Sequence, residues 1–181
     1  MKDESLQELT ASEPLSLEAE YEMQKSWLED DDSASWLTEL TFIVLARGEA
    51  QCGAIDAVTS APMAGDVNIF LAQQPNDDGG AEVTGEAEVM IAESRFRRSG
   101  LATEALQLLL HYVTHEKAGP FPLAEGAIFV RIGKRNTASI ALFEKLGFSR
   151  FSENMVFEEV EMRARSPVTK APVATLTWPV T

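Results

Sequence analysis

Residues 85–113 decide the fold, and they read GEAEVMIAESRFRRSGLATEALQLLLHYV. Residues 86–92 alternate polar with apolar side chains and then turn apolar, which predicts a strand with one polar face. A basic turn follows at residues 95–100. From Leu101 onward, leucines, alanines and a tyrosine recur at helical spacing over more than one face, which predicts a largely buried helix. The stretch therefore predicts a strand that leads into a helix through a basic turn.

The turn between this strand and this helix has the features of an anion-binding site. The first N–H groups of a helix have no partner inside the helix, and the helix dipole is positive at that end. Gly100 and Ala102 have almost no side chain, so a phosphate can approach the backbone, and Arg97 and Arg98 add positive charge. The order of residues matches neither a dinucleotide-binding G-x-G-x-x-G nor a P-loop, so neither of those sites is supported.

A second motif lies downstream, after a predicted strand at residues 127–132. Residues 136–148 read NTASIALFEKLGF. Together and in this order, the two motifs resemble the Gcn5-related N-acetyltransferase (GNAT) superfamily, whose acetyl-CoA loop reads [RQ]-x-x-G-x-[GA]. The resemblance covers roughly residues 2–163 and is closest to the N-acetyltransferase 9-like group of the ribosomal-protein acetyltransferase branch. The segments that carry this closer likeness are residues 9–15, 63–71 and 88–93.

The resemblance implies an α/β fold with a mixed, mostly antiparallel sheet that is splayed where CoA enters and has helices on both faces. It implies an N-acetyltransferase domain at residues 1–164, followed by a disordered tail at residues 165–181. Members usually open with a strand and a fuller first helix, and Met1 falls where that helix should end. We therefore expect the first strand to be missing, which would leave the strand at residues 40–46 at a sheet edge and favour self-association.

Periodicity and turn residues predict the remaining elements. Gly147 suits the left-handed position that ends a helix, which would let Phe148 pack back on Phe143. The predicted helices are residues 16–28 and 136–146, the further strands are residues 63–72, 148–152 and 155–163, and residues 73–81 form a predicted hairpin loop.

Composition limits the choice of partners and compartment. A length of 181 residues fits one domain, and a net charge of −14 argues against nucleic acid or an anionic membrane surface. With a single cysteine, Cys52, no internal disulfide can form, and neither a signal peptide nor a long apolar span is present. We therefore expect a cytoplasmic protein. His111 and His115 have zinc-binding spacing but no further ligand, so we expect a solvent-facing pair and no metal.

The resemblance implies how acetyl-CoA would be held. Backbone N–H groups after the basic turn would bind the pyrophosphate, and the backbone of Met90, Ile91 and Ala92 would pair with pantetheine, with one amide able to polarise the thioester carbonyl. Asn136 would contact pantetheine, although it could equally be a plain helix N-cap. The other predicted cofactor-binding residues are Arg97, Arg98, Ser99, Gly100, Leu101, Ala102, Thr103 and Phe143.

Two residues are predicted to carry the proton transfers. Glu86 and Glu88 share the polar face of the predicted strand, where burial would raise a carboxyl pKa toward that of a useful base. Glu88 matches the glutamate of this branch and is the predicted base; the alternative is a carboxylate that orients the substrate or forms an ion pair. Many members place a tyrosine acid where this chain has Phe143, so Ser139 is the predicted acid. The alternative is a serine bonded to its own helix.

These features predict transfer of an acetyl group from acetyl-CoA to a primary amine, on a protein N-terminus or a lysine. Two other functions stay open. The chain could keep the fold as a binding module without turnover, because Phe143 cannot donate a proton and the first strand is expected to be missing. It could also acetylate a small amine.

Overall fold

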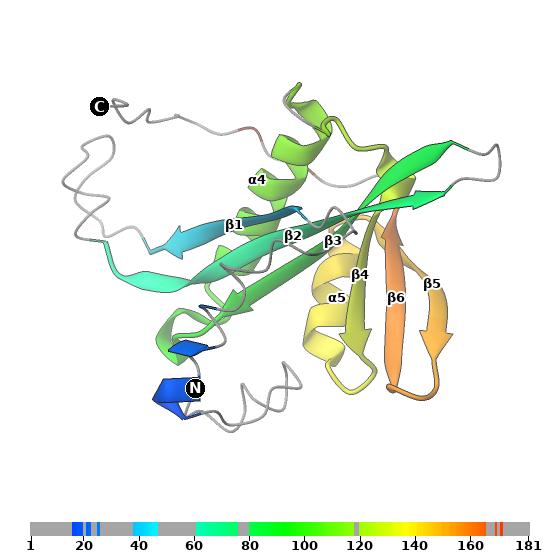
Figure 1. Ribbon diagram of the computed structural model, residues 1–181. Helices are drawn as coiled ribbons and strands as arrows, with labels where there is room; N and C mark the ends of the chain where they lie inside the picture. The colour runs from blue at the N-terminus through cyan, green and yellow to red at the C-terminus, as the bar shows by residue number, and fades with distance from the viewer. Residues whose placement is uncertain are drawn as a thin grey trace.

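The structure, a computed structural model, describes residues 16–19, 21–22, 25, 38–46, 61–75, 80–117, 120–165, 169 and 171. They contain a six-stranded sheet of order β1-β2-β3-β4-β6-β5 (Figure 1). Its strands are β1 (Thr38–Leu45), β2 (Met63–Pro75), β3 (Ala81–Ile91), β4 (Ile128–Gly133), β5 (Phe148–Asn154) and β6 (Glu159–Ala164). The α-helices are α4 (Leu101–His115) and α5 (Thr137–Lys145), and the short 3-10 helices are η1 (Ser94–Phe96) and η2 (Glu125–Ala127).

The sheet is antiparallel except at its centre, where β3 and β4 run parallel. These two strands pair only at Gly85 with Ile128 and at Glu86 with Phe129. Beyond that point they separate, and the sheet opens in a V between them (Figure 1). The predicted mixed, mostly antiparallel and splayed sheet is therefore confirmed.

A single apolar core joins the sheet to both α-helices. The helix α4 passes behind the sheet (Figure 1), packs on β2 and β3, and buries Leu106, Leu109 and Leu110 in the core, while α5 contributes Ile140 and Phe143 to the same cluster. Along each strand, residues that face the core alternate with residues that face the other side, as expected for a sheet with one covered face. They include Val67, Ile69, Leu71, Ala87, Ile128, Val130, Ile132, Val160 and Met162.

Local features of the sequence correctly predicted the positions of most helices and strands. Gly147 has a φ of 85°, the left-handed conformation expected at the end of a helix. The rings of Phe143 and Phe148 lie 5.1 Å apart in an edge-to-face arrangement, as predicted. The helix predicted from residue 16 is seen at residues 17–19, 21–22 and 25, and the rest of it lies outside the described residues.

Two predicted boundaries on the sheet were wrong. β2 continues to Pro75, so the predicted loop at residues 73–81 is shorter, because cross-strand pairing with β3 extends to that residue. The strand predicted at residues 155–163 starts only at Glu159. Asn154 closes a turn there, since its Oδ1 accepts the N–H groups of Val156 and Phe157.

Within the described sheet, β1 forms one edge, as predicted for residues 40–46. Phe42 is 41% exposed and Ile43 is 56% exposed on this edge strand. Self-association through it stays a prediction. Most of the predicted tail at residues 165–181 lies outside the described residues.

Gly65 should be irreplaceable where β2 passes β3. A Cβ atom at this position would lie 1.8 Å from the carbonyl oxygen of Met90. We expect Gly65→Ala to reduce the free energy of unfolding by about 1–3 kcal/mol or more, because the two backbones would have to separate. The control is Gly133→Ala, since a Cβ there meets nothing within 4 Å. Thermal melting followed by circular dichroism measures both, and equal midpoints for the two variants would contradict the expectation.

Candidate active site

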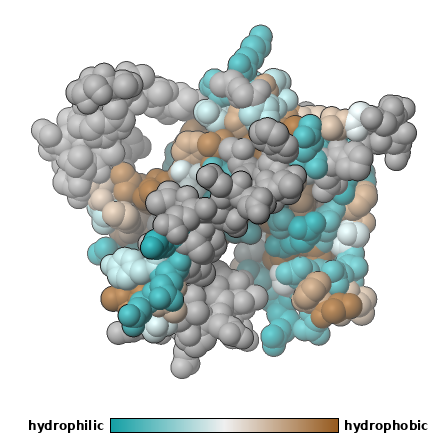
Figure 2. Space-filling view, viewed as in Figure 1, coloured by the Kyte–Doolittle hydropathy of each residue, from teal (hydrophilic) through white to brown (hydrophobic). Residues whose placement is uncertain are grey.

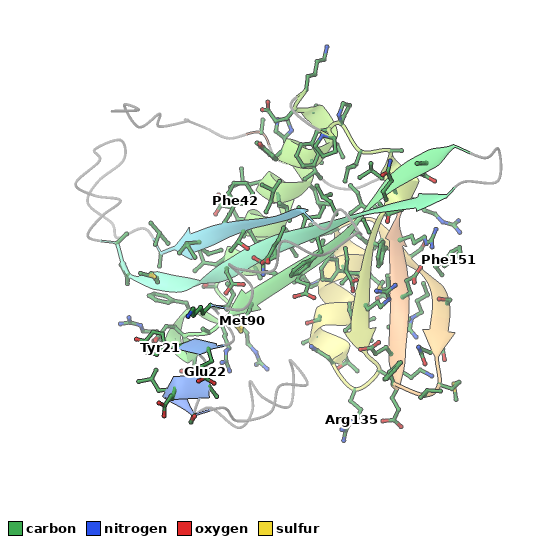
Figure 3. The ribbon with its side chains drawn as sticks, viewed as in Figure 1. Tyr21, Glu22, Phe42, Met90, Arg135 and Phe151 are labelled. Atoms are coloured by element: carbon green, nitrogen blue, oxygen red, sulfur yellow. The ribbon has the colours of Figure 1, made fainter. Side chains whose placement is uncertain are left out.

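The face of the sheet opposite α4 and α5 carries the polar residues of β1, β2 and β3. Strand pairing places Thr41, Asn68 and Glu88 in one row across the three strands, and Asp66 beside Met90 in the next row. In Figure 3 the side chain of Met90 stands on the side of β3 that faces the viewer, away from α4. The row that contains Glu88 is therefore the polar row next to the opening between β3 and β4.

Glu88 is the carboxylate of this row, and its environment suits a base. The residue as a whole is exposed, yet partial burial of its carboxyl group raises its pKa, and the negative charges of Glu39 and Asp66 raise that pKa further. Among the residues that the structure describes, no cation forms an ion pair with it. The charges of the described chain that act on Glu88 therefore favour its neutral form.

Glu86 lies two residues earlier on the same face and has a different environment. Its Oε2 lies 2.7 Å from Nη1 of Arg131 on β4, and its side chain is 21% exposed. Burial raises the pKa of its carboxyl group and outweighs the opposing effect of Arg131. The ion pair considered as an alternative role for Glu88 is thus seen at Glu86 instead.

Asp66 and Asn68 form a hydrogen-bonded pair on β2. Asn68 donates from Nδ2 to Oδ1 of Asp66 at 3.2 Å. Its own Oδ1 is buried and has no hydrogen-bond partner. Burial raises the pKa of Asp66, and the bond from Asn68 partly opposes this increase. The sequence placed both residues on one face of the strand but gave them no role; two polar residues spaced by two in an apolar strand were the available signal.

The basic turn after β3 is held against the end of the strand by Arg97. The guanidinium of Arg97 donates from Nε to the carbonyl of Ile91 and from Nη2 to the carbonyl of Ala92, each at 2.9 Å. Gly100 then adopts a φ of 91° immediately before α4, and it has no side chain with which to cap the helix. The first N–H groups of α4, from Leu101 onward, therefore have no partner within the helix or from its N-cap side chain.

The second motif forms the corresponding turn after β4. Asn136 is the N-cap of α5, and its Oδ1 accepts the N–H of Ser139 at 3.1 Å. Phe143 is 2% exposed and lies in the core. Arg135 projects outward beside this turn (Figure 3). The N-cap considered as an alternative role for Asn136 is therefore present.

The two motifs meet at one end of the molecule. β3 and β4 are parallel, so their C-terminal ends point the same way, and each leads into a helix. The N-termini of α4 and α5 consequently flank the opening of the V (Figure 1). The structure places the residues predicted for the pyrophosphate, for pantetheine and for proton transfer around this opening.

A polar hollow of about 350 Å³, which the sequence did not reveal, is lined in part by Arg131, the ion-pair partner of Glu86. Hydrophilic side chains predominate on this part of the surface (Figure 2). The hollow lies between β4 and the β5–β6 hairpin, and the pairing of β4 with β6 brings these segments together. Its lining residues are Arg131, Ser152, Glu153, Asn154, Met155, Glu159 and Glu161.

His111 and His115 stack with ring centroids 4.2 Å apart, and Nδ1 of His115 lies 2.9 Å from the hydroxyl of Thr114. In the described ranges, no group of three or more histidine, cysteine or acidic residues could hold a metal ion. The helices of these ranges also include none long and apolar enough to cross a membrane.

A parallel strand pair that separates between two helix N-termini is the splayed sheet that the resemblance to the acetyltransferases implies. Residues 2–149 match the acetyltransferase (GNAT) domain family. The chain therefore belongs to the GNAT family, and it is an acetyl-CoA-dependent N-acetyltransferase.

Relatives of known sequence and structure agree with this assignment. The chain is 42% identical to the N-acetyltransferase 9-like protein of Caenorhabditis briggsae, over 90% of this chain and 72% of that protein. It is 43% identical to the alpha/beta-tubulin-N-acetyltransferase 9 of Homo sapiens, over 90% of this chain and 70% of that protein. A crystallised domain from Methanocaldococcus jannaschii shares the fold with a TM-score of 0.54 at 22% identity, covering 83% of this chain and 76% of that one.

Proposed function

We propose that this enzyme acetylates the α-amine of a protein N-terminus in the cytoplasm, that tubulin is its acceptor, and that Glu88 is its base. The observation that carries the proposal is the position of Glu88, which lies without a cation partner among the described residues in the row beside the opening of the sheet. The tubulin acetyltransferase named among its relatives supports the choice of acceptor. The net charge of −14 favours a cationic acceptor.

Acetyl-CoA would lie in the opening between β3 and β4. The N–H groups of Arg98, Ser99, Gly100, Leu101, Ala102 and Thr103 would bind the pyrophosphate, since first-turn N–H groups and the helix dipole both favour an anion. Met90, Ile91 and Ala92 would pair with pantetheine through their backbone, where β3 has no pairing to β4. Asn136 uses its oxygen as the N-cap, so its amide nitrogen is the group that could donate to pantetheine. Phe143 would support α5 from the core.

The residues of the chain would then move two protons. Glu88 takes one proton from the acceptor ammonium, directly or through a water molecule, and leaves a neutral amine. The amine nitrogen attacks the thioester carbonyl, the new C–N bond forms, and the C–S bond breaks as the thiolate departs. The attacking nitrogen loses its second proton, and the thiolate gains one, from Ser139 or from solvent. The net products are the acetylated amine, CoA and one proton.

The acceptor can be tested with defined amines. We expect label from acetyl-CoA to appear, by mass spectrometry, on the α-amine of peptides that carry the N-terminal sequences of α- and β-tubulin. The same peptides with blocked N-termini and a free lysine, and the polyamine spermidine, are the comparisons. Preferred labelling of lysine or spermidine would replace the proposed acceptor. No labelling of any amine, with CoA still bound, would favour the binding-module alternative.

The pyrophosphate site can be tested at Gly100. Gly100→Glu places a negative charge beside the helix N-terminus, so we expect CoA binding to be lost by calorimetry. Because φ is 91° here, any side chain strains the backbone, and Gly100→Ala is the matched control that adds this strain without charge. We expect Gly100→Ala to retain most of the affinity. Wild-type affinity in Gly100→Glu would rule out this position as the pyrophosphate site.

The base can be tested at Glu88. We expect Glu88→Gln to lower kcat by roughly 10²-fold or more with CoA affinity unchanged, because the amide cannot accept the proton. The pKa of Glu88 is raised from its usual value of 4.5, so kcat/KM should rise with pH through that raised pKa and then level off. Glu86→Gln is the matched control, since its carboxylate is paired with Arg131, and it should reduce turnover less. Full activity of Glu88→Gln at every pH would exclude a base role.

A further inference from the structure

We propose that Asn68 is a positioning residue for Glu88: its side-chain oxygen accepts a hydrogen bond from the Glu88 carboxyl group after that group has taken the proton of the acceptor amine. The inference rests on the proposed role of Glu88 as the base. It assigns a role to a polar pair on β2 that the acetyl-CoA site does not use.

Strand pairing brings the two side chains together. Asn68 and Glu88 are directly opposite each other on the antiparallel strands β2 and β3, and both lie on the open face. Directly opposite residues in such a pair have Cβ atoms about 4.5–5.5 Å apart. Each side chain extends beyond its Cβ, so a carboxyl group at Glu88 can reach the amide oxygen of Asn68 by choice of rotamer.

The amide of Asn68 is oriented in advance. Its Nδ2 donates to Oδ1 of Asp66, and this bond fixes the orientation of the amide group. The Oδ1 of Asn68 is consequently directed away from the Asp66 carboxylate, and it is buried without a hydrogen-bond partner. A buried acceptor without a donor is unfavourable, so a donor at some stage of the reaction cycle is expected.

The described side chains beside Asn68 on β1 and β2 offer no hydrogen to its Oδ1. Thr41, across on β1, already gives its hydroxyl hydrogen to Glu39 at 2.7 Å. Asp66 receives the hydrogen of Asn68 itself. Phe70, the next residue on this face of β2, has no polar hydrogen in its side chain. Glu88 in its protonated form therefore remains as the adjacent side chain with a hydrogen to give.

The bond would have a direct effect on the strength of the base. A hydrogen bond to the neutral form of a carboxyl group stabilises that form and raises its pKa. The charges that act on Glu88 are those of Glu39 on β1 and Asp66 on β2. Glu86 on β3 is paired with Arg131 on β4, and the further carboxylates there, Glu159 and Glu161 on β6, act on Glu86. Glu39 and Asp66 both favour the neutral form of Glu88, so a hydrogen bond to Asn68 would raise the pKa of Glu88 in the same direction.

The proton balance of the step is complete. The carboxylate of Glu88 takes H⁺ from the acceptor ammonium, which becomes a neutral amine. The new O–H group donates to Oδ1 of Asn68, and no further reactant is required. When Glu88 later releases this proton to solvent, Oδ1 of Asn68 loses its partner and the starting state returns.

The test replaces the acceptor with an apolar side chain of similar size. In Asn68→Leu, we expect the pKa of Glu88, measured by ¹³C NMR on the labelled carboxyl group and assigned with Glu88→Gln, to fall by about half a unit to one unit. The ascending limb of kcat/KM against pH should move by the same amount. Added apolar bulk alone would desolvate Glu88 and shift the pKa upward, so the direction separates the two effects. Thr41→Val, on the other side of Asn68, is the control and should leave the pKa unchanged.

The outcomes separate this inference from the proposed function. A lower pKa in Asn68→Leu but not in Thr41→Val supports the bond. An unchanged or higher pKa overturns it, even if Glu88→Gln is inactive and the base role stands. Full activity in Glu88→Gln removes the base role, and with it the catalytic meaning of the bond, whatever the NMR shows. If Asn68→Leu does not fold, Asn68→Val gives the same measurement with a side chain that suits a strand.

Discussion

The site depends on the early end of the pairing between β3 and β4. The two strands are paired over two residues and then separate, although each remains bonded to its outer neighbour. Backbone groups on the inner edges beyond Glu86 and Phe129 are therefore not used by the opposite strand. An extended ligand rich in amides, such as pantetheine, can satisfy such groups as a short strand would. Arg97 supports this geometry by binding the carbonyl oxygens at the end of β3.

The distribution of the core explains why polar side chains can occupy the other face. Both α4 and α5 contribute to one apolar cluster on one side of the sheet. Alternation along the strands then directs every second residue of β2 and β3 to the opposite side, where Asp66, Asn68, Glu86 and Glu88 lie. Because β3 and β4 are parallel, the same arrangement brings two helix N-termini to one edge. The residues proposed for anion binding and for proton transfer thus lie on neighbouring parts of a single sheet.

Two glutamates two residues apart acquire different properties in this setting. Both have a raised pKa, mainly because of burial. Glu86 is held by Arg131, whereas the charged groups that act on Glu88, Glu39 and Asp66, carry the same sign as Glu88 itself. A carboxylate among like charges takes up a proton more readily than one beside a guanidinium. This difference favours Glu88 for proton uptake.

The sequence by itself determined the features that depend on neighbours along the chain. Helical spacing located α4, the glycine requirement of a left-handed residue located Gly147, and the two motifs identified the family and the order of its turns. Only the tertiary structure decided that Glu86, rather than Glu88, is paired with a cation, because Arg131 is 45 residues away in the sequence. The same holds for Asn68, whose position opposite Glu88 is set by strand register. These features depend on contacts between strands that are distant in the chain, and periodicity within one strand carries no information about which residues of another strand lie opposite.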